Sequence, residues 1–246
     1  MRQIHVVIAP GSADWWIMNL SFLICGVLLY RSSKHDRWSL RQEGIAKFIT
    51  FVLICNVVTH HIYFFSLGDW SLKHNLPLQL CAMSELIAIS MLLTRSQFLY
   101  ELLLCWSAGA IHAFITPELT HGYGALENTA YVVSHGGVIL TALFANWSLG
   151  FTPRKHSWLK IFLFTQLTLP VIGGVNYLTG ANYMFLSEPP AAKNPMIIGK
   201  WPWYIVSLEL VVLVHFFLFY QIHLWVARVR DRSMAKTEDL GLGAGE

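Results

Sequence analysis

The stretch GIAKFITFVLICNVVTHHIYFF, residues 44–65, carries one Lys side chain, Lys47, in an otherwise largely apolar segment. A run of this length can cross a hydrocarbon core about 30 Å thick as an α-helix, which rises about 1.5 Å per residue. The rest of the chain is similar, since 55% of its 246 residues are hydrophobic and only 13% are charged. A water-soluble domain would not normally show this composition, which is typical of a polytopic membrane protein.

Seven apolar runs are long enough to span a membrane. They cover residues 14–30, 44–65, 76–94, 97–116, 131–149, 158–178 and 202–227. The sequence therefore predicts an all-α fold, a bundle of seven transmembrane helices that forms one domain over residues 1–227. Residues 228–246 contain charge and glycine but nothing to bury, so we expect them to form a disordered cytoplasmic tail.

The basic residues are distributed unevenly between the two sides of the predicted bundle. Thirteen of the 17 Lys and Arg residues fall on the side that receives the loop after the first span, and four fall on the other side. Positive loops are retained on the cytoplasmic face. The sequence thus predicts an outer N-terminus, an inner C-terminus and a multi-pass protein of the cell membrane. The one long loop, residues 179–201, then lies outside, and long ordered loops are often lids.

Polar side chains gather in the outer half of this bundle. At about 1.5 Å of rise per residue, Cys81 lies about 8 Å below the outer end of the third span. Glu85 lies one turn deeper on the same face, and His135 lies at nearly the depth of Cys81. Because polar groups in a bilayer usually face the bundle interior or a wet cavity, we expect a polar chamber under the long loop. Further candidates to line it are Gln79, Asn56, His60, His112, Asn176, Asn182, Tyr183 and Glu209.

Cys81 and His135 suggest nucleophilic chemistry. A cysteine attacks as its thiolate, which a helix N-terminus favours, and Pro77, a favoured first-turn residue, stands just before Cys81. His135 could take the thiol proton and later return it to a leaving group. The alternative interpretation of Cys81 is packing, because cysteine is among the most buried residue types. None of the four cysteines lies in a loop or in a CxxC pair, so neither a disulfide framework nor a thiolate zinc site is expected.

Four short motifs occur in the chain in a fixed order. LPLQLC opens the third span, SHGG opens the fifth, NYM follows the sixth and WPWY opens the seventh. In these motifs the chain resembles the YwaF family of bacterial integral membrane proteins. That family is related to eukaryotic proteins, transmembrane protein 164-like, that are regarded as cysteine-dependent acyltransferases making ether phospholipids. The resemblance implies an acyl-cysteine mechanism, with Cys81 as the nucleophile and His135 as its histidine.

The leading hypothesis is therefore an integral membrane acyltransferase that moves fatty-acyl groups between ether and other phospholipids at the outer leaflet. Cys81 would form the acyl intermediate, and His135 would serve as general base and acid. Gln79, Asn176 or Asn182 would steady the oxyanion or orient the histidine. The expected partners are membrane lipids; neither a cofactor nor a nucleic acid is expected.

Two other classes of function also fit the sequence. A metal-dependent membrane lipid hydrolase could use His60, His112 and His135 as three imidazole ligands that leave a fourth position open. A seven-helix sensor would use the one-sided chamber as a ligand pocket, and a transporter would relay protons through Glu85 and Glu209.

Overall fold

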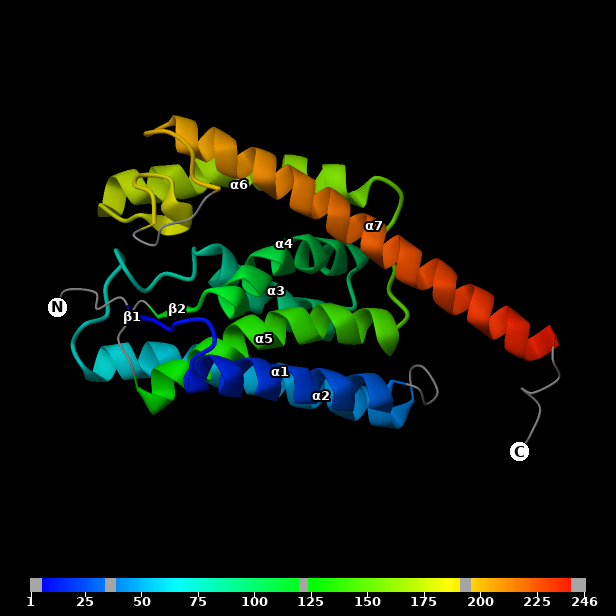
Figure 1. Cartoon of the computed structure of the whole chain (residues 1–246). Helices are drawn as coiled ribbons and strands as arrows, with labels where there is room; N and C mark the ends of the chain where they lie inside the picture. The colour runs from blue at the N-terminus through cyan, green and yellow to red at the C-terminus, as the bar shows by residue number, and fades with distance from the viewer. Residues whose placement is uncertain (1–5, 34–38, 120–123, 191–195, 240–246) are drawn as a thin grey trace.

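The computed structural model describes residues 6–33, 39–119, 124–190 and 196–239 (Figure 1). In this part of the chain, two short strands, β1 (Val6–Val7) and β2 (Glu118–Leu119), pair antiparallel, and a 3₁₀-helix, η1 (Tyr183–Phe185), follows the sixth α-helix. The α-helices are α1 (Ala13–Ser32), α2 (Leu40–Ser66), α3 (Leu80–Thr94), α4 (Gln97–Ile115), α5 (Ala125–Trp147), α6 (Ser157–Thr179) and α7 (Trp203–Asp239). The structure thus confirms a mainly helical fold.

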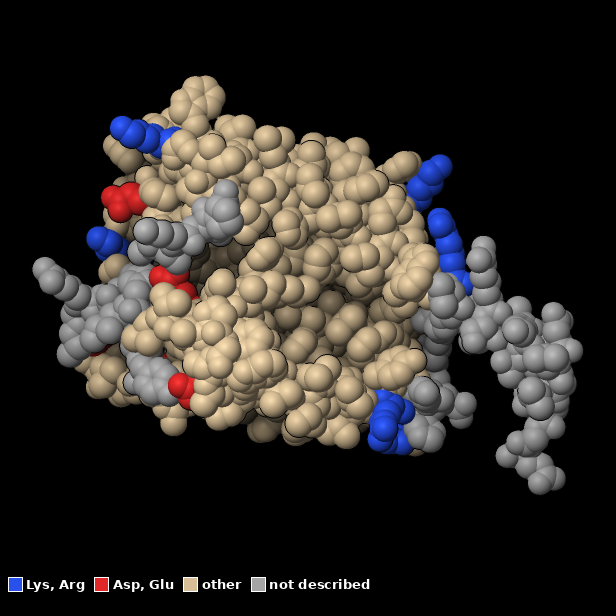
Figure 2. Space-filling view, viewed as in Figure 1, with Lys and Arg blue, Asp and Glu red and all other residues tan. Residues whose placement is uncertain are grey.

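Most of these helices suit a lipid environment. Six of those in the described residues are long and apolar enough to cross a membrane, and α3, with 15 residues, is a shorter apolar helix. Figure 2 shows a broad uncharged belt, with Lys, Arg, Asp and Glu side chains confined to its two ends. The chain is therefore a multi-pass membrane protein. A seventh span and the direction of the bundle stay predictions.

The start of α3 differs from the prediction, because the helix begins at Leu80 and not at residue 76. Pro77 has no N–H to donate and disfavours the helical conformation at Leu76, and Gln79 is extended, with φ −71° and ψ 145°. Cys81 is consequently the second residue of the helix. It lies nearer to the positive end of the helix dipole than the sequence had suggested.

The last helix is longer than its predicted span. α7 continues past residue 227 as far as Asp239, so it covers the first part of the predicted tail. Residues 240–246 lie outside the described residues, and the disorder of the tail stays a prediction.

α4 is the central helix of the bundle. α3 and α5 pack on one side of it, and α6 and α7 form a layer on the other (Figure 1). α1 and α2 pack against α5 from outside. Two glycines allow α5 to approach its neighbours closely: a Cβ at Gly137 would lie 2.5 Å from Leu53 Cδ2 on α2, and one at Gly136 would lie 3.3 Å from Phe114 Cζ on α4.

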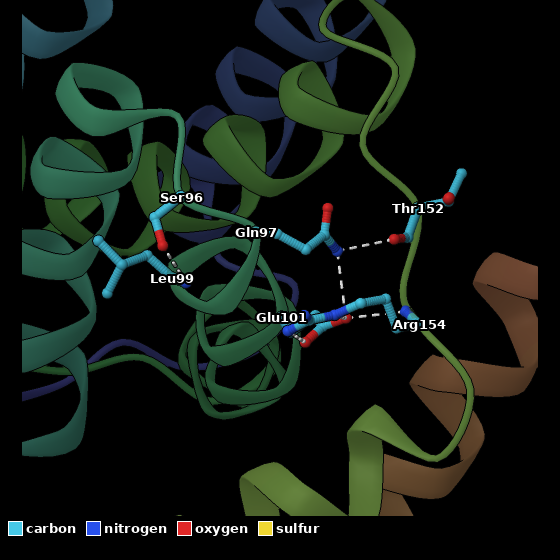
Figure 3. A network of polar contacts seen from close by, with 6 residues as sticks. All are labelled: Ser96, Gln97, Leu99, Glu101, Thr152 and Arg154. Atoms are coloured by element: carbon cyan, nitrogen blue, oxygen red, sulfur yellow. Dashed lines mark hydrogen bonds and ion pairs between the residues drawn. The ribbon is translucent and has the colours of Figure 1, made fainter.

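A buried carboxylate fastens the end of the bundle opposite β1 and β2 (Figure 3). Glu101 on α4 is 2% exposed. It accepts hydrogen bonds from the main-chain N, Nε and Nη2 of Arg154 at 2.8, 2.9 and 2.8 Å. Gln97 Nε2 donates to Glu101 at 3.1 Å and to the carbonyl of Thr152 at 2.8 Å. The network ties the connection between α5 and α6 to the first turns of α4, and it raises the pKa of the Arg154 guanidinium.

Removing the arginine should cost more than neutralising the acid. Arg154→Ala is expected to lower the free energy of unfolding by about 3 kcal/mol, because it strands a buried carboxylate. Glu101→Gln should cost less, since it leaves behind a guanidinium side chain that is 58% exposed and can be hydrated. Thermal unfolding in detergent measures both, with Lys155→Ala at an exposed neighbouring position as the control. Equal losses for Arg154→Ala and Lys155→Ala would contradict the prediction.

Candidate functional site

Cys81 lies in the first turn of α3, at the end of the bundle that carries β1 and β2 (Figure 1). Its thiol is within electrostatic range of the Tyr131 hydroxyl on α5 and of the Glu85 carboxylate one turn further along α3. α4 borders the same space, because the Tyr131 hydroxyl donates to the carbonyl of Ala113 at 3.0 Å. The partly buried thiol therefore sits where α3, α4 and α5 meet.

His135 belongs to the same cluster. Its ring packs against Tyr131 with the ring centroids 4.1 Å apart, and its Nδ1 lies 2.9 Å from the main-chain oxygen of Tyr131. A carbonyl oxygen can only accept, so Nδ1 carries the proton and Nε2 keeps its lone pair in the neutral ring. The His135 ring thus packs against a tyrosine that interacts electrostatically with the Cys81 thiol, and its tautomer leaves Nε2 as the basic atom of the histidine.

Glu85 joins a fourth helix, α2, to this cluster. The carboxylate is 4% exposed and accepts a hydrogen bond from Asn56 Nδ2 on α2 at 2.9 Å, and the Ser134 side chain on α5 also interacts with it. A carboxylate buried in a membrane protein is costly unless such partners satisfy it. Sequence reasoning missed Ser134, although this residue stands next to His135 in the SHGG motif.

The segment after α6 is fastened to the segment before α3. Tyr183 is 2% exposed. Its hydroxyl donates to the carbonyl of Leu72 at 2.8 Å and accepts from the N–H of Leu76 at 2.9 Å. Asn176 holds Tyr183 from the other side, because its Oδ1 accepts from the Tyr183 N–H and its Nδ2 donates to the Tyr183 carbonyl, at 2.8 and 2.9 Å. This part of the long loop therefore covers the start of α3.

Gln79 links the same loop to the first residues of α3. Its Oε1 accepts from the N–H of Met184 at 2.9 Å and does not cap the helix. Met184 and Phe185 have φ values of 55° and 54°, which residues other than glycine rarely adopt. Asn182 closes its own turn, since its Oδ1 accepts from the N–H groups of Ser187 and Glu188. Strained backbone of this kind persists only where its surroundings hold it.

A second cover comes from the N-terminal segment, which sequence reasoning missed. The N–H of Ile8 donates to the carbonyl of Pro117 at 3.0 Å, next to the β1–β2 pair. Ile8 also forms a small apolar cluster with Leu119 and Met18, against which Tyr131 packs. Both covers close the β1–β2 end. Figure 2 shows that the molecule is instead hollowed on its side, between the α6–α7 layer and the helices below it.

Two residues that the sequence suggested for the chamber, His112 and Glu209, make their contacts with α7 and α6, respectively, and not with the cluster at Cys81. His112 Nε2 on α4 lies 3.0 Å from His215 Nε2 on α7. The amide of Gln166 on α6 donates to the carboxylate of Glu209 on α7. The first pair joins α4 to α7, and the second joins α6 to α7. The depth of a residue along its helix does not reveal such contacts.

The three histidines of the metal hypothesis do not come together. His60 packs against the Phe64 ring, with the ring centroids 4.9 Å apart, His112 pairs with His215, and His135 binds the carbonyl of Tyr131. Among the residues that the structure describes, no group of three or more His, Cys, Asp or Glu side chains could hold a metal ion. The arrangement therefore gives the metal hypothesis no support.

Removing the Tyr183 hydroxyl should loosen the loop. Tyr183→Phe leaves the Leu76 N–H without its partner, so we expect opening of this segment to become easier by about 1–3 kcal/mol. Burial raises the pKa of Tyr183. The stabilisation of the loop by the protonated hydroxyl is therefore fully present below the ordinary tyrosine pKa of about 10, and it is lost as the pH rises through the higher pKa of the folded protein. Backbone hydrogen exchange of residues 72–76 measures the opening. Tyr177→Phe, at a position 89% exposed, is the control, and unchanged exchange in Tyr183→Phe would refute the prediction.

Comparison with known proteins gives one family match. The model of the TMEM164 family matches residues 10–220, a range that includes the cluster around Cys81 and both fastenings of the long loop. No curated protein and no solved structure matches the chain.

Proposed function

The chain belongs to the TMEM164 family, and from this premise we propose that it is a membrane acyltransferase. It moves fatty-acyl groups between phospholipids, ether phospholipids included, through an acyl-cysteine intermediate. The observation that carries the proposal is that Tyr131 packs against the His135 ring and interacts electrostatically with the Cys81 thiol, while Nε2 of the histidine is left unprotonated. Covalent catalysis needs a base that serves the nucleophile and a third group that orients the base, and we assign these roles to His135 and Tyr131.

In the first half of the reaction, the Cys81 thiol gives its proton to Nε2 of His135, and the sulfur attacks the ester carbonyl of a donor phospholipid. The C–S bond forms and the ester C–O bond breaks. The proton then passes from His135 to the departing oxygen, which leaves a lysophospholipid and acyl-Cys81. The Nδ1–H bond to Tyr131 keeps the ring in the tautomer that this step requires.

In the second half, the hydroxyl of an acceptor lysophospholipid attacks the thioester. A C–O bond forms, the C–S bond breaks, and the hydroxyl proton passes through His135 to the Cys81 sulfur. The enzyme returns to its starting state, and the number of ester bonds is unchanged. The reaction needs neither a metal nor a cofactor.

The start of α3 supplies donors for the oxyanion that both halves create. The first N–H groups of a helix have no partner within it, and the Gln79 side chain does not cap this helix. The main-chain N–H of Cys81 and Nε2 of Gln79 are therefore the donors that we assign to the oxyanion. Asn176 and Asn182, which the sequence also suggested, are instead engaged in shaping the loop.

We place the site in the outer leaflet. When the shorter helix α3 is included, the bundle has seven spans. The Lys and Arg distribution then makes the β1–β2 end the outer one. The long loop and the N-terminal segment cover that end, and the hollow lies in the uncharged belt (Figure 2). These features support access for a lipid from the side, within the bilayer.

Intact-mass spectrometry of the purified protein tests the proposal. After incubation with diacyl phospholipids in detergent, we expect a fatty-acyl adduct that hydroxylamine removes and that peptide mapping assigns to Cys81. An adduct on another cysteine, or none from folded protein across donors of varied headgroup and chain length, would refute the mechanism.

A further inference from the structure

His112 on α4 and His215 on α7 form a hydrogen-bonded pair that the proposed mechanism does not use. The two Nε2 atoms lie 3.0 Å apart, and both rings are half-buried. His215 Nδ1 lies 2.7 Å from the carbonyl oxygen of Val211, so this nitrogen carries the proton. In the neutral pair, His215 Nε2 must then accept, and His112 Nε2 must donate. The proton of His112 is thereby fixed on Nε2, and its Nδ1 keeps a lone pair.

That lone pair has no partner among the described residues. Three other histidines within helices, His135, His215 and His223, each turn Nδ1 towards the carbonyl oxygen of the residue four positions earlier. In the described part of the chain, the side-chain hydrogen bond of His112 involves only its Nε2. Nδ1 of His112 is thus a half-buried acceptor that is available to a ligand.

The pair lies at the level of the Cys81 cluster. A Cβ at Gly109, three residues before His112, would lie 3.2 Å from Leu80 Cδ2 on α3. Ala113, directly after His112, accepts the hydrogen bond of Tyr131 on α5. These contacts join the turn of α4 that carries His112 to the first residue of α3 and to the tyrosine of the cluster.

The pair also lies between the two layers of the molecule. α7 packs on α4, and the surface is hollowed between the α6–α7 layer and the helices below it (Figure 2). On α7, the exposed residues Val214 and Leu218 turn away from the buried Phe216, and His215 lies on the flank between these two faces. A lipid that enters between α4 and the α6–α7 layer would meet the flank of α7 that carries His215.

We infer that Nδ1 of His112 binds the free hydroxyl of the acceptor, a lysophospholipid, beside the Cys81 cluster. This inference rests on the proposed function. A nitrogen that only accepts suits a hydroxyl, which donates, and does not suit the carbonyl oxygen of the donor ester, which also accepts. His215 is a positioning residue, because it fixes the tautomer of His112. In the transfer that this binding serves, the hydroxyl turns its O–H from His112 to Nε2 of His135. The C–O bond then forms as the C–S bond breaks, and the hydroxyl proton passes through His135 to the Cys81 sulfur.

Binding can be separated from chemistry in a Cys81→Ala background, which forms no acyl intermediate. The probes are a 1-acyl lysophospholipid and its deoxy analogue, in which hydrogen replaces the free glycerol hydroxyl. Titration in detergent, followed by native mass spectrometry, should show that Cys81→Ala binds the hydroxylated lipid about tenfold more tightly than the analogue. Adding His112→Ala should remove this preference. His112→Phe, which keeps the volume of a ring but has no nitrogen, should remove it as well.

The matched control is His223→Ala, because His223 lies on α7, as His215 does, and its Nδ1 also bonds to a main-chain carbonyl. It should keep the tenfold preference. A preference that survives in both His112 variants, or that is missing before His112 is changed, would overturn the inference. The outcomes stay distinct from those of the proposed function: a preference that depends on His112 without any Cys81 adduct would refute the acyltransferase and keep the hydroxyl site. A Cys81 adduct without the preference would keep the acyltransferase and refute the hydroxyl site.

Discussion

Cys81→Ala should lower the rate of acyl transfer by at least about 10³-fold while the protein stays folded. The variant has no sulfur to carry the acyl group, and the remaining donors can only bind the substrates. The change removes one atom at a partly buried position, so we expect a loss of stability of at most about 1 kcal/mol. The initial rate of transfer of a labelled acyl chain from a phospholipid to a lysophospholipid in detergent measures the effect.

Cys55→Ala provides a matched control, because it makes the same chemical change at an exposed position on α2. Its transfer rate should equal that of the unchanged protein. Thermal unfolding of both variants shows whether a lost activity reflects lost structure. Turnover that persists in folded Cys81→Ala would refute the covalent mechanism.

His135→Ala should lower the rate of acyl-Cys81 formation by about 10²–10⁴-fold, because it removes the base that takes the thiol proton. The effect should appear in both half-reactions, since the same Nε2 also serves the attack by the acceptor. Rapid mixing followed by intact-mass spectrometry measures the first half, and release of the acyl group to a lysophospholipid measures the second.

The control for this variant is His223→Ala, at a histidine that binds the carbonyl of Phe219 on α7. It should leave both rates unchanged. A variant with a purely structural defect would show less folded protein in thermal unfolding but normal rates per folded molecule. Adduct formation by His135→Ala within about twofold of the original rate would contradict the assigned base.

The helical architecture could be predicted because apolar length is a one-dimensional property of a sequence. The start of α3 could not, because Pro77 and the loop contacts of Leu76 and Gln79 decide it together. The strands β1 and β2 are also invisible in the sequence, because two residues each are too few to show alternation.

The candidate site was predicted in part for a similar reason. Depth follows from counting residues along a helix, so the common level of Cys81 and His135 could be estimated. The rotation of each helix about its axis depends on packing between helices, which no single span encodes. His112 and Glu209 therefore lie at suitable depths but face His215 and Gln166.

Two of the contacts that hold the α6–α7 layer sit at opposite ends of the bundle and differ in kind. At one end Arg154 and Glu101 make an ion pair with three hydrogen bonds, and at the other the Tyr183 hydroxyl makes two neutral ones. Two neutral hydrogen bonds break more easily than an ion pair with three charge-assisted hydrogen bonds. If the layers part, the ion pair is thus the natural pivot, and the gap widens most beside Cys81, where a lipid with two chains needs the most room.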